Sequence, residues 1–142
     1  MLRLLSSVVL LGLLTLSSPA TAQGIGQIPY IEQSLDSLES EFRSVGVTRT
    51  WNYSIQSLQD EHYRDHTFRL TEPGYIAIGS DTDTRWISLS ELENGQPARW
   101  DRDSGQRSAN LYFSRAGTYT VRVYIEDCSA AWCFYSIMTG YR

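Results

Sequence analysis

Six acidic side chains in the middle of the chain have a spacing that suits a hard cation. They are Asp81, Asp83, Glu91, Glu93, Asp101 and Asp103. Ca²⁺ takes about six to eight oxygen ligands, several of them carboxylates from adjacent loops. Asp81 and Asp83 precede one expected strand, and Asp101 and Asp103 follow another, so the two pairs are expected to meet at one end of the domain. These four residues are the predicted calcium ligands. The alternative is that they form solvated turns, which aspartate favours.

Aromatic residues are frequent, with four tryptophans and nine tyrosines in 142 residues. An exposed ring stacks on a sugar ring because it combines a flat apolar face with a polar tip. Trp86, Tyr112 and Tyr124 alternate with apolar neighbours on their expected strands, so they point away from the main core and are predicted to bind a ligand. The alternative is that they pack under a helix near the N-terminus.

The sequence offers few candidates for catalysis. His62 and His66 are four residues apart, but on a strand this spacing separates them by about 13 Å, too far to share one ion. The chain lacks a Gly-x-Ser-x-Gly elbow, a free thiol with a histidine partner, and a glycine loop for phosphate. We therefore predict a non-catalytic protein.

Residues 1–22 have the layout of a secretory signal peptide. Arg3 precedes an apolar run of about 13 residues, and the small-residue sequence Ala-Thr-Ala comes just before Gln23. The alternative is a membrane anchor, but a span takes about 20 residues. We expect a secreted or periplasmic protein with no membrane span after cleavage. The net charge of −4 argues against a nucleic-acid partner.

Cys128 and Cys133 are the two cysteines of the chain, and four residues separate them. In an exported protein such a pair predicts a disulfide. The spacing suits two positions that face each other at the mouth of a hairpin. The closed loop is short, so the bond is expected to act as a local staple.

Two regions differ in hydrophobic periodicity. In residues 23–48, Ile31, Leu35, Leu38, Phe42 and Val45 form one apolar stripe and predict an amphipathic helix. The stripe is expected to pack on the following domain or on the same stripe, residues 31–45, of a second copy.

Residues 49–142 alternate with a period of two. About eight strands are predicted, at residues 50–58, 66–70, 74–80, 85–92, 98–100, 109–113, 118–126 and 132–138. Turn signals such as Asn94-Gly95 separate them. Short strands with no helix between them predict an all-β fold, an antiparallel sandwich or barrel.

Several segments, in order, resemble the bacterial pre-peptidase C-terminal domain family. "SRAGTYTVRV" is similar to its penultimate strand, and "DHTFRLTEPGYIAIGS" is similar to an earlier strand, turn and strand. "TDTRWISLSELENGQPARWDRD" resembles its Asp-led strand, Asn-Gly turn and acidic residues, and the match covers about residues 56–140. The resemblance implies a jelly-roll-like β-sandwich, usually appended to secreted hydrolases, with relatives that bind calcium, polysaccharide or fibrous protein.

These observations predict a secreted accessory module that binds an extracellular polysaccharide or protein. Two alternatives are a structural protein that pairs through its N-terminal helix and an adhesion module stabilised by calcium.

Overall fold

The computed structural model describes residues 28–102 and 107–142, so the predicted signal peptide and Asp103 lie outside it. The described chain contains one helix and nine strands. They are α2 (Ile28–Ser44), β1 (Arg49–Asn52), β2 (Gln56–Leu58), β3 (His62–Leu70), β4 (Gly74–Ser80), β5 (Thr84–Glu93), β6 (Gln96–Asp101), β7 (Ser108–Phe113), β8 (Gly117–Cys128) and β9 (Cys133–Tyr141). The helix is not long and apolar enough to cross a membrane.

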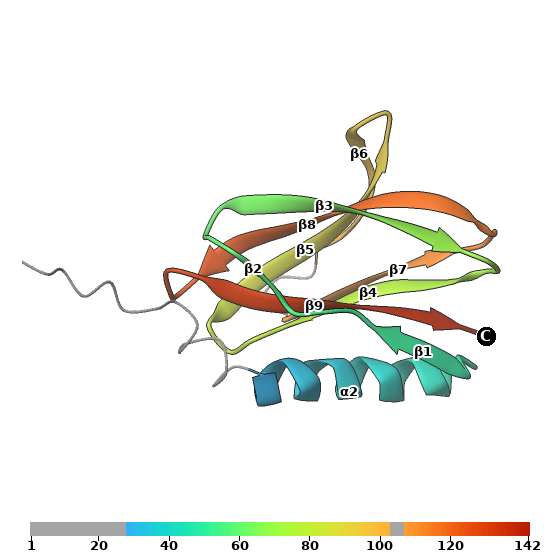
Figure 1. The fold of residues 1–142 in the computed structure, drawn as a ribbon, viewed down its shortest axis with the longest axis horizontal. Helices are drawn as coiled ribbons and strands as arrows, with labels where there is room; N and C mark the ends of the chain where they lie inside the picture. The colour runs from blue at the N-terminus through green and yellow to red at the C-terminus, as the bar shows by residue number, and fades with distance from the viewer. Residues whose placement is uncertain (1–27, 103–106) are drawn as a thin grey trace, which may run out of the picture.

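The strands form two antiparallel sheets that face each other (Figure 1). The first sheet has the order β1-β9-β4-β7, with β2 also on β9, and the second has the order β3-β8-β5-β6. Four strand pairs therefore nest inside one another along the chain: β2–β9, β3–β8, β4–β7 and β5–β6. This nesting is the jelly-roll arrangement. The predicted all-β sandwich with one N-terminal helix is confirmed.

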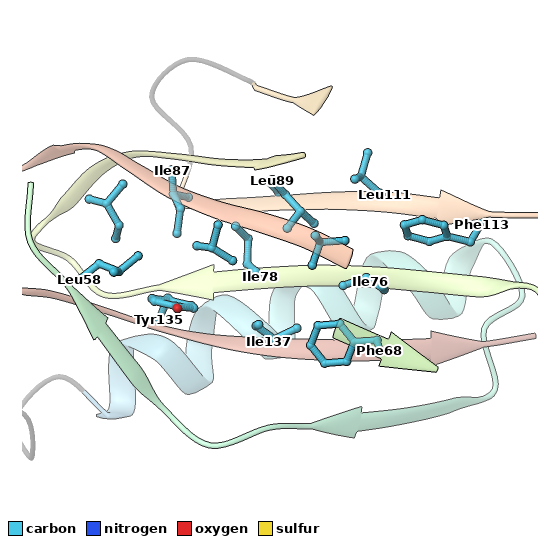
Figure 2. Packing of buried hydrophobic residues seen from close by; sticks show 14 of the residues in the cluster. Leu58, Phe68, Ile76, Ile78, Ile87, Leu89, Leu111, Phe113, Tyr135 and Ile137 are labelled. Carbon is cyan, nitrogen blue, oxygen red and sulfur yellow. The ribbon is translucent and has the colours of Figure 1, made fainter. Parts of the chain in front are cut away.

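The main core lies between the sheets, because alternate residues of each strand point inward. On β8 the inward residues Val121, Val123 and Ile125 are fully buried. They pack in one cluster with residues of the facing sheet such as Ile78 and Ile137 (Figure 2). The predicted Asn94-Gly95 turn joins β5 and β6, and both residues have positive φ, as a tight hairpin requires.

Helix α2 packs on the outer face of the first sheet, against β4 and β9 (Figure 1). Ile31, Leu35, Leu38 and Phe42 are buried there with Ala77 and Met138. The prediction that the stripe covers its own domain is confirmed. Pairing of two copies through residues 31–45 is not supported, because the stripe is already covered.

One residue of the predicted stripe was placed wrongly. The helix ends at Ser44, and Val45 is 45% exposed. Val47 joins the buried cluster instead. Gly46, with φ of 91°, reverses the chain between these two valines, so the helical spacing stops before Val45.

The predicted disulfide joins Cys128 to Cys133, with 5.9 Å between the Cα atoms. The expected hairpin is wrong, because Cys128 ends β8 in the second sheet and Cys133 begins β9 in the first. The bond therefore links the two sheets at the corner where the chain crosses between them.

Candidate functional site

The structure separates the acidic residues that were predicted to bind calcium. Asp81 lies in the connection between β4 and β5. Asp101 pairs with Leu89 of β5, whereas Asp81 lies just before Thr84, the first residue of β5. Thr84 and Leu89 are five residues apart, which is about 16 Å at the rise of a strand. Within residues 28–102 and 107–142 no three His, Cys, Asp or Glu side chains form a group that could hold a metal ion. A calcium site that uses Asp103 stays a prediction.

Asp81 is fully buried and holds the start of β5 against β9. Its Oδ1 accepts hydrogen bonds from Thr84 N at 3.1 Å and Thr84 Oγ1 at 2.8 Å, and its Oδ2 accepts one from Phe134 N at 2.8 Å. Burial raises the pKa of Asp81, although these donors oppose the shift. Nearby, the main-chain oxygen of Asp83 accepts hydrogen bonds from Ser129. The contacts of Asp81 give this carboxylate a structural role.

Asp101 and Arg99 form hydrogen bonds with main-chain groups on the unpaired edge of β7. The Oδ2 atom of Asp101 accepts a hydrogen bond from Asn110 N at 2.6 Å. The Nη1 atom of Arg99 donates one to the Tyr112 carbonyl at 2.9 Å. Since an unpaired strand edge invites association with other chains, these two side chains of β6 protect the sandwich.

The three aromatic residues predicted to bind a ligand lie on two different faces. Tyr112 is on the helix side, with its ring 4.9 Å from that of Tyr75, which in turn stacks on Phe42 at 4.6 Å. For Tyr112 the structure therefore agrees with the alternative interpretation, in which the aromatic residue packs beside the helix. Trp86 and Tyr124 belong to β5 and β8 in the other sheet. Of the three, these two are left as candidates for a binding surface.

Trp86 and Tyr124 lie on the outer surface of the β3-β8-β5-β6 sheet, which we call the open face. Helix α2 covers the opposite side of the sandwich (Figure 1). Cross-strand partners share a face, and two rows of such partners cross this sheet. One row contains Tyr63, Tyr124 and Ser88, and the next contains Asp65, Arg122, Ser90 and Trp100.

Two exposed rings stand on the edge strands of the open face. Tyr63 on β3 is 57% exposed, and Trp100 on β6 is 54% exposed. Between them, on β5, Ser88 and Ser90 are buried, because their short side chains lie below their larger neighbours. The open face therefore has an exposed aromatic ring on each edge strand, and the two serines of β5 are covered by their neighbours.

A fixed ion pair lies beside Tyr63. Arg122 Nε and Nη2 donate to the two carboxylate oxygens of Asp65, at 2.7 and 2.9 Å. The hydrogen bond from Arg122 holds the pKa of Asp65 below its usual value. The Arg122 guanidinium also lies 3.9 Å from the centre of the Tyr63 ring. These contacts hold three polar side chains of the face in one arrangement.

Trp86 is half-covered by a second ion pair. The guanidinium of Arg102 lies 5.5 Å from the Trp86 ring centre and donates twice to Glu126 Oε2, at 3.0 and 2.6 Å. Among the residues that the structure places, Trp86 Nε1 and Glu126 Oε1 are buried without a hydrogen-bond partner. A ring in this position is less accessible than Tyr63 or Trp100.

Tyr63 and Trp100 were not among the predicted ligand-binding residues. A signal for Tyr63 is present in the alternation of β3, where Tyr63, Asp65, Thr67 and Arg69 place four polar or amphipathic side chains on one face. Trp100 belongs to a short strand whose register is set by its pairing with β5. Its direction could not be inferred from the segment itself.

His66 is the second titratable group with a distinctive environment. It is half-buried at the edge of the core, and its Nε2 lies 2.8 Å from the hydroxyl of Tyr135. Burial lowers the pKa of His66 and raises that of Tyr135 to about 12. The tyrosine therefore stays protonated, and the imidazole favours its neutral form.

We expect the stability of the protein to fall in mild acid because of His66. Its pKa is lower in the folded chain than the ordinary value of 6.5, so the unfolded chain binds the proton more tightly. The contribution of neutral His66 to the free energy of unfolding is complete above pH 6.5 and is lost as the pH falls through the folded pKa. Urea unfolding between about pH 5 and pH 8 measures it. His66→Gln should flatten this dependence; an unchanged slope would contradict the assignment.

Comparison with known proteins identifies no family. No family model matches the chain, and no curated protein matches it. Similar solved structures include a periplasmic inhibitor of g-type lysozyme from Aeromonas hydrophila, 10% identical over 69% of this chain and 90% of that chain, with a TM-score of 0.43. They also include the pre-peptidase C-terminal domain of a collagenase from Bacillus anthracis, 16% identical over 66% of this chain and 89% of that one, with a TM-score of 0.43. A third is the low-affinity xylan binding module CBM86 from Roseburia intestinalis, 16% identical over 65% and 76%, with a TM-score of 0.39.

Proposed function

We propose that this protein is an exported, non-catalytic binding module of the pre-peptidase C-terminal type that holds an extracellular polysaccharide on its open face. The observation that carries the proposal is the pair of exposed rings, Tyr63 and Trp100, on the two edge strands of a polar sheet surface.

The dimensions of the open face suit a chain of sugar rings. Tyr63 and Trp100 are three strand spacings apart across the sheet, about 14 Å, and one row of partners apart along the strands. Trp100 offers a flat apolar surface for a sugar face, and Tyr63 offers the face of its ring that Arg122 does not cover. The Asp65–Arg122 pair between them offers charged hydrogen-bonding groups to sugar hydroxyls. A polymer that crosses the strands would contact all of these groups.

Two further observations support the exported and non-catalytic parts of the proposal. The Cys128–Cys133 disulfide is typical of proteins in oxidising compartments. On the open face, Asp65 and Glu126 are each held in an ion pair with an arginine. Neither carboxylate is poised as the free acid or base that hydrolysis requires.

Removal of either edge ring should weaken polysaccharide binding. We expect Trp100→Ala and Tyr63→Ala each to raise Kd about tenfold, since loss of one stacking ring costs about 1.4 kcal/mol. Affinity electrophoresis through gels that contain neutral plant or bacterial polysaccharides measures the change as lost retention.

Trp132→Ala is the matched control, because Trp132 is also exposed but lies in the β8–β9 connection. It should leave retention unchanged. The proposal would be refuted if retention fell equally in all three variants. It would also be refuted if no polysaccharide retarded the folded wild-type protein.

A further inference from the structure

A groove runs along the edge of the sandwich between β1 and β3, and we call it the edge groove. It contains two adjoining hollows of about 310 and 290 Å³ that share Tyr53 as a wall. Gln56, His66 and Arg69 line the first hollow, and Trp51 and Thr139 line the second. Hollows of this size suit small ring-shaped ligands.

Two aromatic rings are left exposed in this groove although they lie on the inner side of the first sheet. Trp51 pairs with Thr139, which lies on the same face as the buried core residue Ile137. Tyr53 has the same parity, and its ring contacts that of Phe68 at 5.0 Å. Inner-face aromatic residues are normally covered, yet Trp51 is 54% exposed and Tyr53 46%. Both rings are available to a ligand.

The floor of the groove contains a polar group without a partner. The Thr139 side-chain oxygen is buried and has no hydrogen-bond partner among the residues that the structure describes. Buried hydroxyl groups are nearly always hydrogen-bonded. An oxygen atom of a ligand in the hollow would satisfy this hydroxyl.

The charge at the groove is locally positive in a chain whose net charge is −4. Arg49 pairs with Glu72 at one end. Arg64 donates instead to the neutral side chain of Gln56 at 2.8 Å. Arg69 makes no ion pair within residues 28–102 and 107–142. Six other arginines in this part of the chain are paired with carboxylates, so Arg64 leaves an unbalanced positive charge beside Gln56 at the first hollow. Arg69 lies about 16 Å from Arg64 along β3 and has the outward parity of Tyr63 and Asp65.

We propose that the edge groove is a second binding site that takes a carboxylate-bearing sugar, such as a uronic-acid unit of an acidic polysaccharide. The rings of Trp51 and Tyr53 stack on sugar rings, Thr139 donates to a sugar oxygen in the second hollow, and Arg64 binds the carboxylate of a unit in the first hollow. The inference rests on the proposed function only in the class of ligand, because it uses different residues from the open face.

The test compares an acidic with a neutral polysaccharide on the same variants. We expect Arg64→Gln to lose about tenfold in affinity for polygalacturonate. Its retention by the neutral polysaccharide that the open face binds should not change. Arg43→Gln removes one positive charge from α2, as Arg64→Gln does from β3, so it is the control and should bind both polymers normally.

A second variant separates the groove from a general effect of charge. Thr139→Val keeps the shape of the side chain and removes the hydroxyl, so it should weaken polygalacturonate binding without a change in net charge. Equal loss in Arg43→Gln, or full retention of Arg64→Gln by polygalacturonate, would overturn the inference while the effect of Trp100→Ala on the neutral polymer stands. Poly-glutamate carries carboxylates but no sugar rings. If it competed for polygalacturonate binding as strongly as galacturonate oligomers do, the assignment of the ligand as a sugar would be overturned.

Discussion

Phe42→Ala is expected to lower the free energy of unfolding by about 3–5 kcal/mol. Phe42 is buried between α2 and the first sheet, and it stacks on Tyr75 at 4.6 Å. A Cβ atom at Gly140 would lie only 3.3 Å from its ring, so the ring already fills the space above the sheet. The cavity left by alanine cannot be refilled by such neighbours without movement of the helix.

Urea unfolding followed by tryptophan fluorescence measures this loss. Val45→Ala is the control, because Val45 comes three residues later but is exposed beyond the end of the helix. Its effect should stay within about 0.5 kcal/mol. If the two variants lose similar stability, the packing of the helix described here is incorrect.

Asp81→Ala should have the second largest effect, a loss of about 2–4 kcal/mol. The carboxylate accepts three hydrogen bonds from Thr84 and Phe134 in a fully buried position. Alanine leaves those donors without an acceptor, and each buried, unsatisfied donor costs about 1–3 kcal/mol. Part of the cost is recovered because burial of the charge itself is unfavourable, as the raised pKa of Asp81 indicates.

Asp81→Asn gives a sharper test, since the shape is kept. One amide oxygen can serve Thr84, but the amide nitrogen then faces the Phe134 N–H, so we expect a smaller loss than with alanine. The pKa of Asp81 is higher in the folded chain than its ordinary value of 3.8, so the folded chain binds this proton more tightly than the unfolded chain. The resulting stabilisation is complete below pH 3.8 and is lost as the pH rises through the folded pKa. Asp81→Asn should remove that part of the pH dependence in unfolding experiments.

Asp36→Asn is the control for Asp81, because Asp36 is exposed on α2. It should have the same free energy of unfolding as the wild-type protein. If Asp81→Asn is as stable as Asp36→Asn, then Asp81 does not hold β5 against β9.

The strands and the helix could be predicted because their signals are local. Val121, Val123 and Ile125 alternate with polar residues, and this alternation alone indicates a strand with one buried side. The spacing of Ile31, Leu35 and Leu38 indicates the helix in the same way. The disulfide follows from two cysteines that lie close together in the sequence.

The roles of the acidic residues could not be predicted in this way. Asp81 and Asp101 occupy turn-like segments, which suggested solvent or a cation. In the fold they accept main-chain hydrogen bonds from Phe134 and Asn110, which are distant in the sequence. The pairing of β9 with β4 brings Phe134 to Asp81, and the packing of one sheet on the other brings Asn110 of β7 to Asp101 of β6.

In strands with a clear alternation, such as β8, the sequence by itself determined which residues share the inward side, because alternation is a property of a single extended segment. Only the tertiary structure decided which of the two outer faces the helix covers. Small residues make the difference, since Ala77, Gly79 and Gly140 let α2 approach the first sheet closely. The other sheet carries larger polar side chains such as Arg122 on its outer face, and it stays open. Tyr112 is therefore packed beside the helix, whereas Tyr124, which has the same outward parity, lies on the open face.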